Sequence, residues 1–238
     1  MNNILLLFIS VLVFIATFTV FVDNNYMITA IFAVFLLMQC YLGKINIWIS
    51  ILLGMLVSGY DAIAFYFTKN THVGVPFKYK HVDIQLTQQP MWDILFLAIF
   101  NNMMILTYRI FNTSSRFQLS WFNLYYTFLL AILALISWIY FNYDHNLFTI
   151  VLSIIVLAYF YVVRIDLSAI LATLIIFPIM EHIFISTSNV YVPPKTPGEI
   201  FIGEEPLYWF VYYFWWIIGV SFLYYFLAKK LPVALIGK

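Results

Sequence analysis

The sequence ILLLFISVLVFIATFTVFV, residues Ile4–Val22, contains no charged side chain. An α-helix needs roughly 20 mostly apolar residues to cross the hydrocarbon core of a bilayer, so this stretch alone is long enough to span a membrane. No Lys or Arg precedes it and no small-residue cleavage pattern follows it. We therefore expect a retained transmembrane span and not a signal peptide.

Similar apolar stretches recur along the rest of the chain. The eight candidate spans are Ile4–Val22, Met27–Leu42, Ile45–Tyr66, Met91–Tyr108, Trp121–Phe141, Leu147–Val163, Leu167–Ile185 and Leu207–Ala228. Because the second and the sixth are short, seven or six crossings stay open as alternatives. The sequence therefore predicts an all-α polytopic membrane protein with about eight transmembrane helices.

The composition excludes several functional classes. Of the 238 residues, 65% are hydrophobic and only 9% are charged, with a mean hydropathy of +0.98. Soluble domains have about 25% charged residues, so a soluble enzyme is excluded. The net charge of +1 leaves no basic surplus for a phosphate backbone, and we expect no nucleic-acid partner. The single cysteine, Cys40, can form neither an intrachain disulfide nor a cysteine metal cluster.

The charges between the spans predict an orientation, because Lys and Arg accumulate in cytoplasmic loops. With eight spans, most basic residues fall on the side that carries both termini: Lys44, Arg109, Arg116, Arg164, Lys229, Lys230 and Lys238. The opposite side holds Lys69, Lys78, Lys80 and Lys195, together with most acidic residues and the two long connections, 67–90 and 186–206. We expect a multi-pass protein in a lipid bilayer with both termini in the cytoplasm.

Polar residues recur in the same order at separations of 116 to 121 residues. The matching pairs are Asp23-Asn24-Asn25 with Asp144-His145-Asn146, Lys44-Ile45-Asn46 with Arg164-Ile165-Asp166, Asp61 with Glu181, Asp83-Ile84 with Glu199-Ile200, and Gln88-Gln89-Pro90 with Glu204-Glu205-Pro206. An even number of spans in each copy gives both copies the same orientation. The sequence therefore predicts two parallel four-helix repeats, residues 1–112 and 113–238, within one integral membrane domain.

Asp61 and Glu181 are the sharpest candidates for chemistry, because an acidic residue in a membrane span is costly and is usually buried against a partner or faces a cavity. One interpretation places both just outside the hydrocarbon, where they cap helices or bind water. In the other, the two-fold symmetry places them across a shared cavity, where desolvation favours the protonated carboxyl group and makes it a proton donor. His182 adjoins Glu181.

Three further acidic residues lie at a predicted helix start or in a loop. Asp93 opens the fourth span, where helix capping is the favoured role. Glu204 and Glu205 precede Pro206 and form either a solvated loop pair or a pair that shares a proton or binds a cation.

Asn101 and Asn102 lie in mid-span, where interhelical hydrogen bonding is the usual explanation.

No cofactor or metal is expected. The four histidines have no helix-face metal spacing, and the sequence has no dinucleotide fingerprint of the Gly-x-Gly-x-x-Gly kind.

The last span is aromatic through its length, including Tyr208, Trp209 and Trp216. Membrane-interface anchoring explains many such rings, but rings also pack against a flat polyene and stabilise a carbocation through cation–π attraction.

Short motifs in both copies carry a family resemblance. The first copy has Gly59-Tyr60-Asp61, His72-Val73-Gly74-Val75-Pro76 and Pro90-Met91-Trp92-Asp93; the second has Met180-Glu181, Asn189-Val190-Tyr191-Val192-Pro193 and Glu204-Glu205-Pro206-Leu207-Tyr208-Trp209. This arrangement resembles the membrane lycopene cyclase domain family of carotenoid and isoprenoid cyclases, which are built from homologous units. Neither copy has the family's Pro-x-Glu-Glu turn in register, since the two glutamates of the second copy precede the proline.

The resemblance implies an isomerase that cyclises a polyene. A protonated carboxyl group would start the reaction, aromatic rings would shelter the cation, and a carboxylate would take a proton back. The catalytic candidates are Asp61, Glu181, Asp93, Glu204 and Glu205. The substrate-binding candidates are Tyr60, Trp92, His182, Tyr191, Tyr208 and Trp209.

Two alternatives come from other functional classes, so whether the chain is an enzyme stays open. Parallel repeats with polar residues at their interface also build small transporters and channels. A non-catalytic subunit of a larger membrane complex would use the same apolar, aromatic surface for helix packing and would have membrane partners.

Overall fold

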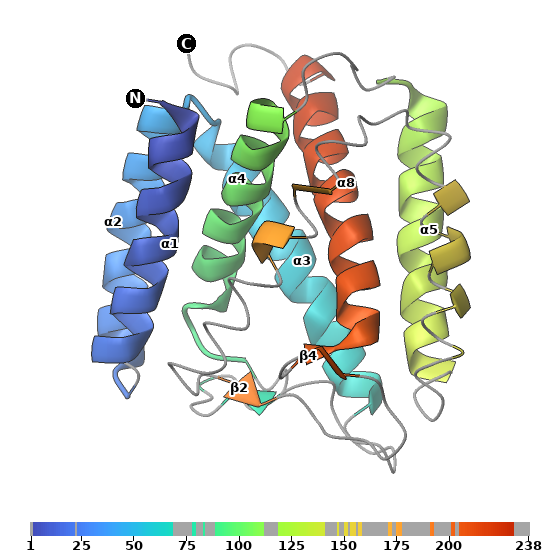
Figure 1. Ribbon diagram of the computed structural model, residues 1–238, viewed down its shortest axis with the longest axis horizontal. Helices are drawn as coiled ribbons and strands as arrows, with labels where there is room; N and C mark the ends of the chain where they lie inside the picture. Colours follow the sequence, from blue (N-terminus) through green and yellow to red (C-terminus); the bar gives the residue numbers. More distant parts are fainter. Residues whose placement is uncertain are drawn as a thin grey trace.

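The protein is a bundle of long helices (Figure 1). The computed structural model describes residues 2–21, 23–68, 78–79, 83, 89–111, 119–140, 147, 150–151, 153–155, 157–158, 171–172, 175–177, 191–192, 201–202 and 205–230. Only the backbone is described for the strands, for 64–65, 134 and 137–140, and for most of 205–218. Within that part the helices are α1 (Asn3–Val20), α2 (Asn25–Gly43), α3 (Ile47–Thr68), α4 (Asp93–Phe111), α5 (Trp121–Tyr140) and α8 (Leu207–Lys230).

These helices confirm six of the expected apolar stretches to within three residues at each end. The stretches Leu147–Val163 and Leu167–Ile185 fall largely outside the described residues, although the residues described there are helical. Within the described part, three helices are long and apolar enough to cross a membrane, namely α1, α2 and α4. The second stretch, short by sequence, forms a 19-residue helix.

Short strands add small pieces of sheet to this helical fold. The antiparallel pairs join β1 (Lys78–Tyr79) to β2 (Tyr191–Val192) and β3 (Phe201–Ile202) to β4 (Glu205–Pro206). The expectation of an all-α protein therefore needs a minor correction. Isolated two-residue strands give too weak an alternation of polar and apolar residues to be read from a sequence.

Polar side chains define where the helices begin. The side-chain oxygens of Asn24 and Asn46 accept hydrogen bonds at 3.0 Å from the backbone N–H groups of Met27 and Ile49, in the first turns of α2 and α3. An Asn at this position satisfies a helix N–H group that has no partner within the helix. Both caps belong to the repeated polar motifs, so helix capping is one physical reason for the repeat pattern.

Helix α4 is central to the packing and contacts α1, α2, α3 and α8. Its tightest crossing is with α3, where a Cβ built on Gly54 would lie 2.6 Å from the carbonyl oxygen of Ile94 and 2.9 Å from the Cβ of Ala98. Small residues allow two helix backbones to approach closely, which is how many membrane helices associate. A cluster of aromatic rings fills the adjoining space between α1, α2 and α4, made of Phe14, Phe18, Phe32, Trp92 and Phe96.

A buried polar network links α1, α2, α3 and α4. The Asn102 side chain donates to Gln39 Oε1 at 3.0 Å and accepts a hydrogen bond from the Ser50 hydroxyl group, and Gln39 donates to Ser10 at 2.9 Å. Asn101 on the same helix accepts from the Trp216 indole of α8 at 3.0 Å. The expectation that Asn101 and Asn102 form interhelical hydrogen bonds is confirmed.

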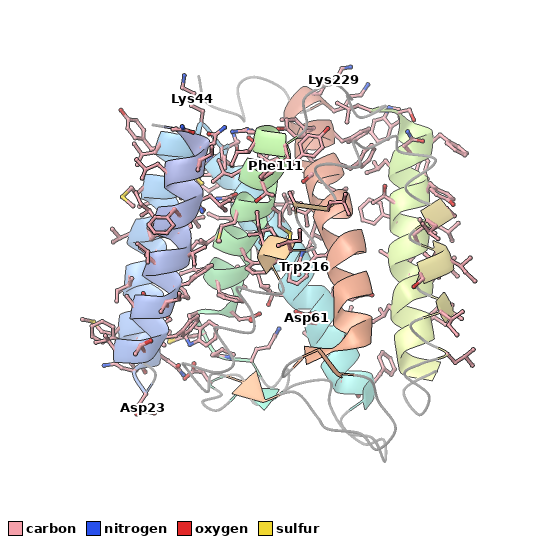
Figure 2. The ribbon with its side chains drawn as sticks, in the orientation of Figure 1. Asp23, Lys44, Asp61, Phe111, Trp216 and Lys229 are labelled. Atoms are coloured by element: carbon pink, nitrogen blue, oxygen red, sulfur yellow. The ribbon has the colours of Figure 1, made fainter. Side chains whose placement is uncertain are left out.

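Basic side chains gather at the end of the bundle where α8 ends. Figure 2 shows Lys44 and Lys229 at this end and Asp23 at the opposite one. The Arg109 guanidinium donates to the carbonyl oxygen of Gly43 at 2.6 Å and to the Tyr225 hydroxyl group at 3.1 Å. A cation at a helix C-terminus complements the exposed carbonyl groups, so Arg109 fastens the end of α2 to α4 and α8.

Candidate functional site

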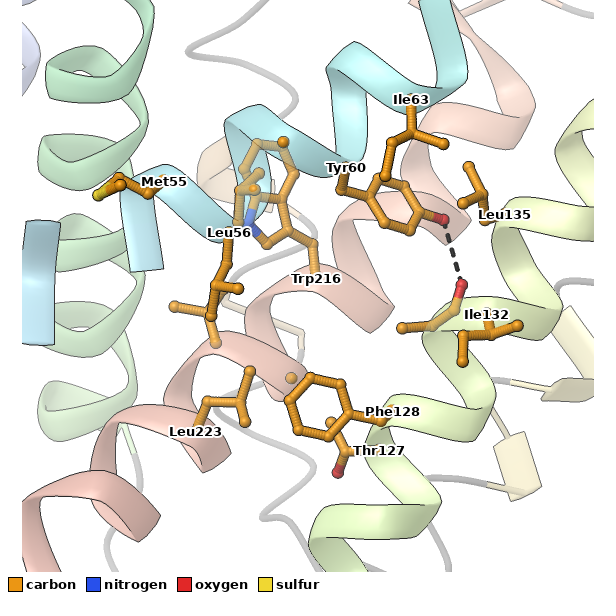
Figure 3. A pocket seen from close by; sticks show the side chains of 15 residues that line it. Met55, Leu56, Tyr60, Ile63, Thr127, Phe128, Ile132, Leu135, Trp216 and Leu223 are labelled. Atoms are coloured by element: carbon orange, nitrogen blue, oxygen red, sulfur yellow. Dashed lines mark hydrogen bonds between the residues drawn. The ribbon is translucent and has the colours of Figure 1, made fainter. Parts of the chain in front are cut away.

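A cavity of about 390 Å³ lies between α3, α5 and α8 (Figure 3). Its walls are almost wholly aliphatic and aromatic. The lining residues on α3 are Met55, Leu56, Val57, Gly59, Tyr60 and Ile63; on α5, Thr127, Phe128, Ala131, Ile132 and Leu135; on α8, Trp216, Gly219, Val220 and Leu223. Concave apolar cavities with a few convergent polar groups are the usual form of a small-molecule site.

Burial distinguishes the mouth of this pocket from its back wall. Side chains from α3 and α5 are widely exposed, with Met55 and Ile132 each 54% exposed and Phe128 44%. On α8, Trp216 and Val220 are buried at 8% and 3% exposure. The pocket therefore opens sideways between α3 and α5, through side chains of the kind that face lipid in a membrane span.

Two glycines leave room in the pocket. A Cβ built on Gly59 meets no atom within 4 Å, and one built on Gly219 meets only the Thr127 methyl group, at 4.0 Å. No close backbone contact requires a glycine at position 219. The missing side chain instead leaves part of the back wall of the pocket open. Gly54, five residues before Gly59 on α3, is glycine for the opposite reason, because α4 leaves no space there.

Only a few polar atoms reach the pocket. The Tyr60 hydroxyl group donates to the carbonyl oxygen of Ala131 at 3.4 Å, as the dashed line in Figure 3 marks. The Thr127 hydroxyl group donates to the carbonyl oxygen of Asn123 at 2.7 Å, which satisfies its proton within α5. The Trp216 indole N–H donates to Asn101. None of the described lining residues carries a charge.

The described acidic candidates lie on the other side of α3 from this pocket. Asp93 is buried at the start of α4, and its carboxylate accepts from the Ser58 hydroxyl group at 2.7 Å and from Gln89 Nε2 at 3.0 Å. Asp61 is buried three residues after Ser58, so the two share one face of α3. Figure 2 shows Asp61 towards the end of the bundle opposite Lys229.

The structure places the described substrate-binding candidates in different surroundings. Tyr60 lines the pocket, whereas Trp92 is buried among Phe18, Phe32 and Phe96 and donates to Asn25 Oδ1 at 2.9 Å. Of Glu205, Tyr191, Tyr208 and Trp209 only the backbone is described, and Glu181, His182 and Glu204 lie outside the described residues. Their assigned roles stay predictions.

Sequence reasoning did not assign the pocket's α5 wall or Gly219 to a site. Thr127, Phe128 and Ile132 look like ordinary residues of an apolar span, and only the packing of α5 against α3 and α8 brings them to one cavity. The one available signal was Gly219, an isolated glycine in an otherwise bulky aromatic helix. Within the described residues, no group of three or more His, Cys, Asp or Glu side chains could hold a metal ion.

Comparison with known proteins gives a likeness of fold alone. No family model matches the chain, and no curated protein matches it. A crystal structure of a cross-linked trimer of an MvINS variant matches with a TM-score of 0.59 at 12% sequence identity, over 79% of this chain and 98% of that one. At this identity the match shows a similar arrangement of helices and does not show a common function.

Proposed function

We propose that this chain is a multi-pass membrane protein that takes a single apolar molecule, of the polyene or lipid kind, from the bilayer into the pocket between α3, α5 and α8. The observation that carries the proposal is the pocket itself, whose exposed mouth and buried wall are both apolar. A molecule dissolved in the bilayer would enter sideways without crossing water. Polar solutes are disfavoured, because an apolar wall offers few hydrogen bonds to replace those lost from water.

Two ring contacts support the parallel repeat as the frame of this site. Phe100 and Trp216 are 5.4 Å apart between ring centroids, and their separation in sequence, 216 − 100 = 116, is one of the offsets that the repeated motifs predict. Tyr108 and Tyr225 lie 5.6 Å apart at an offset of 117, so Tyr225 is one residue beyond the equivalent of Tyr108. Contact between equivalent residues is expected where two repeats meet at a two-fold axis along the membrane normal.

The same repeat indicates that, among the described residues, α4 and α8 are not equivalent at the pocket. The position equivalent to Gly219 at the 116-residue offset is Met103, which is fully buried. A methionine fills the space that a glycine leaves open. Gly219, on α8 in the second copy, would then border an open pocket. The equivalent Met103, on α4 in the first copy, lies in the packed core.

The distribution of charge supports a cytoplasmic position for both termini as part of the proposal. Lys44, Arg109, Lys229 and Lys230 belong to the end of the bundle where α8 ends, and Asp23 lies at the other end. Basic residues are retained on the cytoplasmic side of membrane proteins.

The cyclase reaction stays a prediction that the described pocket does not favour. Proton-initiated cyclisation needs a carboxyl group within reach of the bound polyene. The catalytic candidates with described side chains, Asp61 and Asp93, do not line the pocket. Such an enzyme would therefore depend on Glu181, Glu204 or Glu205, whose side chains are outside the described part. Transport and a complex-subunit role likewise stay predictions.

Replacing Gly219 by Leu should abolish ligand binding without unfolding the protein. The first carbon of the new side chain fits against Thr127, and the remainder occupies the cavity. The measurement is photolabelling of protein in lipid nanodiscs with a hydrocarbon chain that carries a diazirine, followed by peptide mapping of α3 and α5. We expect labelling of the lining peptides to fall about tenfold or more, which corresponds to about 1.4 kcal/mol of binding free energy.

Val34→Leu provides the control, since it adds apolar bulk to a side chain of α2 that is 69% exposed and does not line the pocket. This variant should be labelled as the wild type is. Equal labelling of wild type and Gly219→Leu, with both proteins folded, would overturn the proposal, because the probe would then be binding elsewhere.

A further inference from the structure

We propose that the ligand of this pocket ends in a hydroxyl group, which binds between the Tyr60 phenol and the carbonyl oxygen of Ala131. The inference rests on the proposed function and adds the chemical class and orientation of the ligand: a neutral alcohol with one long apolar chain. Its basis is the one polar contact across the pocket, among the described residues, that joins two helices, α3 and α5.

That contact is longer than a strong hydrogen bond. The Tyr60 hydroxyl oxygen lies 3.4 Å from the Ala131 carbonyl oxygen, whereas O–H···O bonds are usually about 2.7–2.8 Å long. A phenol both donates and accepts, and a carbonyl oxygen has two lone pairs. A ligand hydroxyl group that displaces this long bond accepts a proton from Tyr60 and donates its own to Ala131. The exchange replaces one long hydrogen bond by two of normal length.

Other end groups match these two atoms less well. A ketone accepts from Tyr60 but has no proton for the Ala131 oxygen, and a hydrocarbon does neither. A carboxylate or phosphate would be an uncompensated charge, because no described lining residue is cationic and Asp61 directly follows Tyr60. The alcohol is therefore the end group that satisfies both sides of the pocket.

The remaining lining residues fix the direction of the chain. Thr127 and Trp216 use their protons on Asn123 and Asn101, so neither competes for the hydroxyl group as a donor. Figure 3 shows Tyr60 near Ile63 and Leu135, with Leu223, Phe128 and Thr127 at the far end of the cavity. At 1.5 Å per helical residue, the part of the α5 wall from Ala131, where the hydroxyl group binds, to Thr127 is about 6 Å long. The chain would lie along this wall with its tail towards Leu223.

The test is competition against the diazirine hydrocarbon probe in nanodiscs, with dodecanol, dodecane and dodecanoate as competitors. For the wild type we expect dodecanol to compete about fivefold better than dodecane, and dodecanoate to compete worst. In Tyr60→Phe the preference for dodecanol should disappear while competition by dodecane stays unchanged. Farnesol, compared with dodecanol, distinguishes an isoprenoid source from an acyl source of the same end group.

The outcomes separate this inference from the proposed function. If Tyr60→Phe retains the full preference for dodecanol, or if dodecane competes as well as dodecanol in the wild type, the hydroxyl-group inference is wrong and the pocket proposal survives. If the probe labels wild type and Gly219→Leu equally, the pocket proposal fails first. Tyr66→Phe, which makes the same chemical change six residues further along α3 and outside the pocket, should retain the preference and controls for the loss of a phenol hydroxyl group as such.

Discussion

Replacing Gly54 by Ala should destabilise the bundle severely, although alanine is the better helix former. The added methyl group would lie 2.6 Å from the Ile94 carbonyl oxygen and 3.0 Å from the Ala98 backbone nitrogen. These are backbone atoms of α4 and cannot rotate away, so the two helices must separate. Overpacking of this kind costs about 3 kcal/mol, which outweighs the helix propensity gain of about 1 kcal/mol. The measurement is the unfolding free energy in mixed detergent micelles, from titration with SDS.

The control for this variant lies on the same helix. Gly59→Ala makes the same chemical change where the methyl group meets nothing within 4 Å, so its stability should equal or slightly exceed that of the wild type. Adding Ala98→Gly to Gly54→Ala should restore only part of the loss, because the contact with the Ile94 carbonyl oxygen remains. A Gly54→Ala protein as stable as Gly59→Ala would show that α3 and α4 do not cross as closely as described.

The difference between these two glycines also shows where sequence reasoning ends. Both lie in one apolar stretch at a spacing of five residues, and composition and hydropathy treat them alike. Helix positions are readable because a membrane span is set by local hydrophobicity, and the caps at Asn24 and Asn46 are readable because a cap is a local feature. Which helix lies against Gly54 and which cavity borders Gly59 depend on contacts between distant parts of the chain.

The acidic residues show the same limit. The sequence predicts Tyr60, Asp61, Trp92 and Asp93 as site candidates because they lie in the motifs of the first copy that carry the family resemblance. Helix geometry separates Tyr60 from Asp61 by about 100° around α3, which directs one into the pocket and the other towards the side of Ser58. Because Tyr60 and Asp61 are adjacent in sequence, they lie at the same level along the bundle. They do not face the same site, since only Tyr60 lines the pocket.

The polar network predicts a second large effect, at Asn102. Replacement by Leu keeps the volume similar but removes the donor to Gln39 and the acceptor for the Ser50 hydroxyl group. All three residues are fully buried, so water cannot replace the lost hydrogen bonds. A buried polar group left without a partner costs about 1–3 kcal/mol, and interhelical hydrogen bonds in membranes contribute at the lower end of that range. We expect the unfolding free energy, measured by the same SDS titration, to fall by about 2 kcal/mol.

The neighbouring asparagine makes this prediction specific. Asn101 is equally buried, but among the described residues it makes one side-chain hydrogen bond, to Trp216, and its Nδ2 group has no partner. Asn101→Leu removes an unsatisfied buried donor and at the same time leaves the indole N–H without its acceptor. The two effects oppose each other, so this variant should be close to the wild type in stability.

A double substitution tests whether the loss at Asn102 comes from unsatisfied partners or from packing. Removing both members of a buried hydrogen-bonded pair costs less than removing one, because no polar group is left behind. Gln39→Leu combined with Asn102→Leu should therefore lose less stability than the sum of the single variants, because the Ser10 hydroxyl group keeps its bond to the Leu6 carbonyl oxygen at 2.8 Å and only the Ser50 hydroxyl group loses the acceptor to which it donated. Strict additivity, or equal losses for Asn101→Leu and Asn102→Leu, would mean that shape and not hydrogen bonding determines the stability of this part of the bundle.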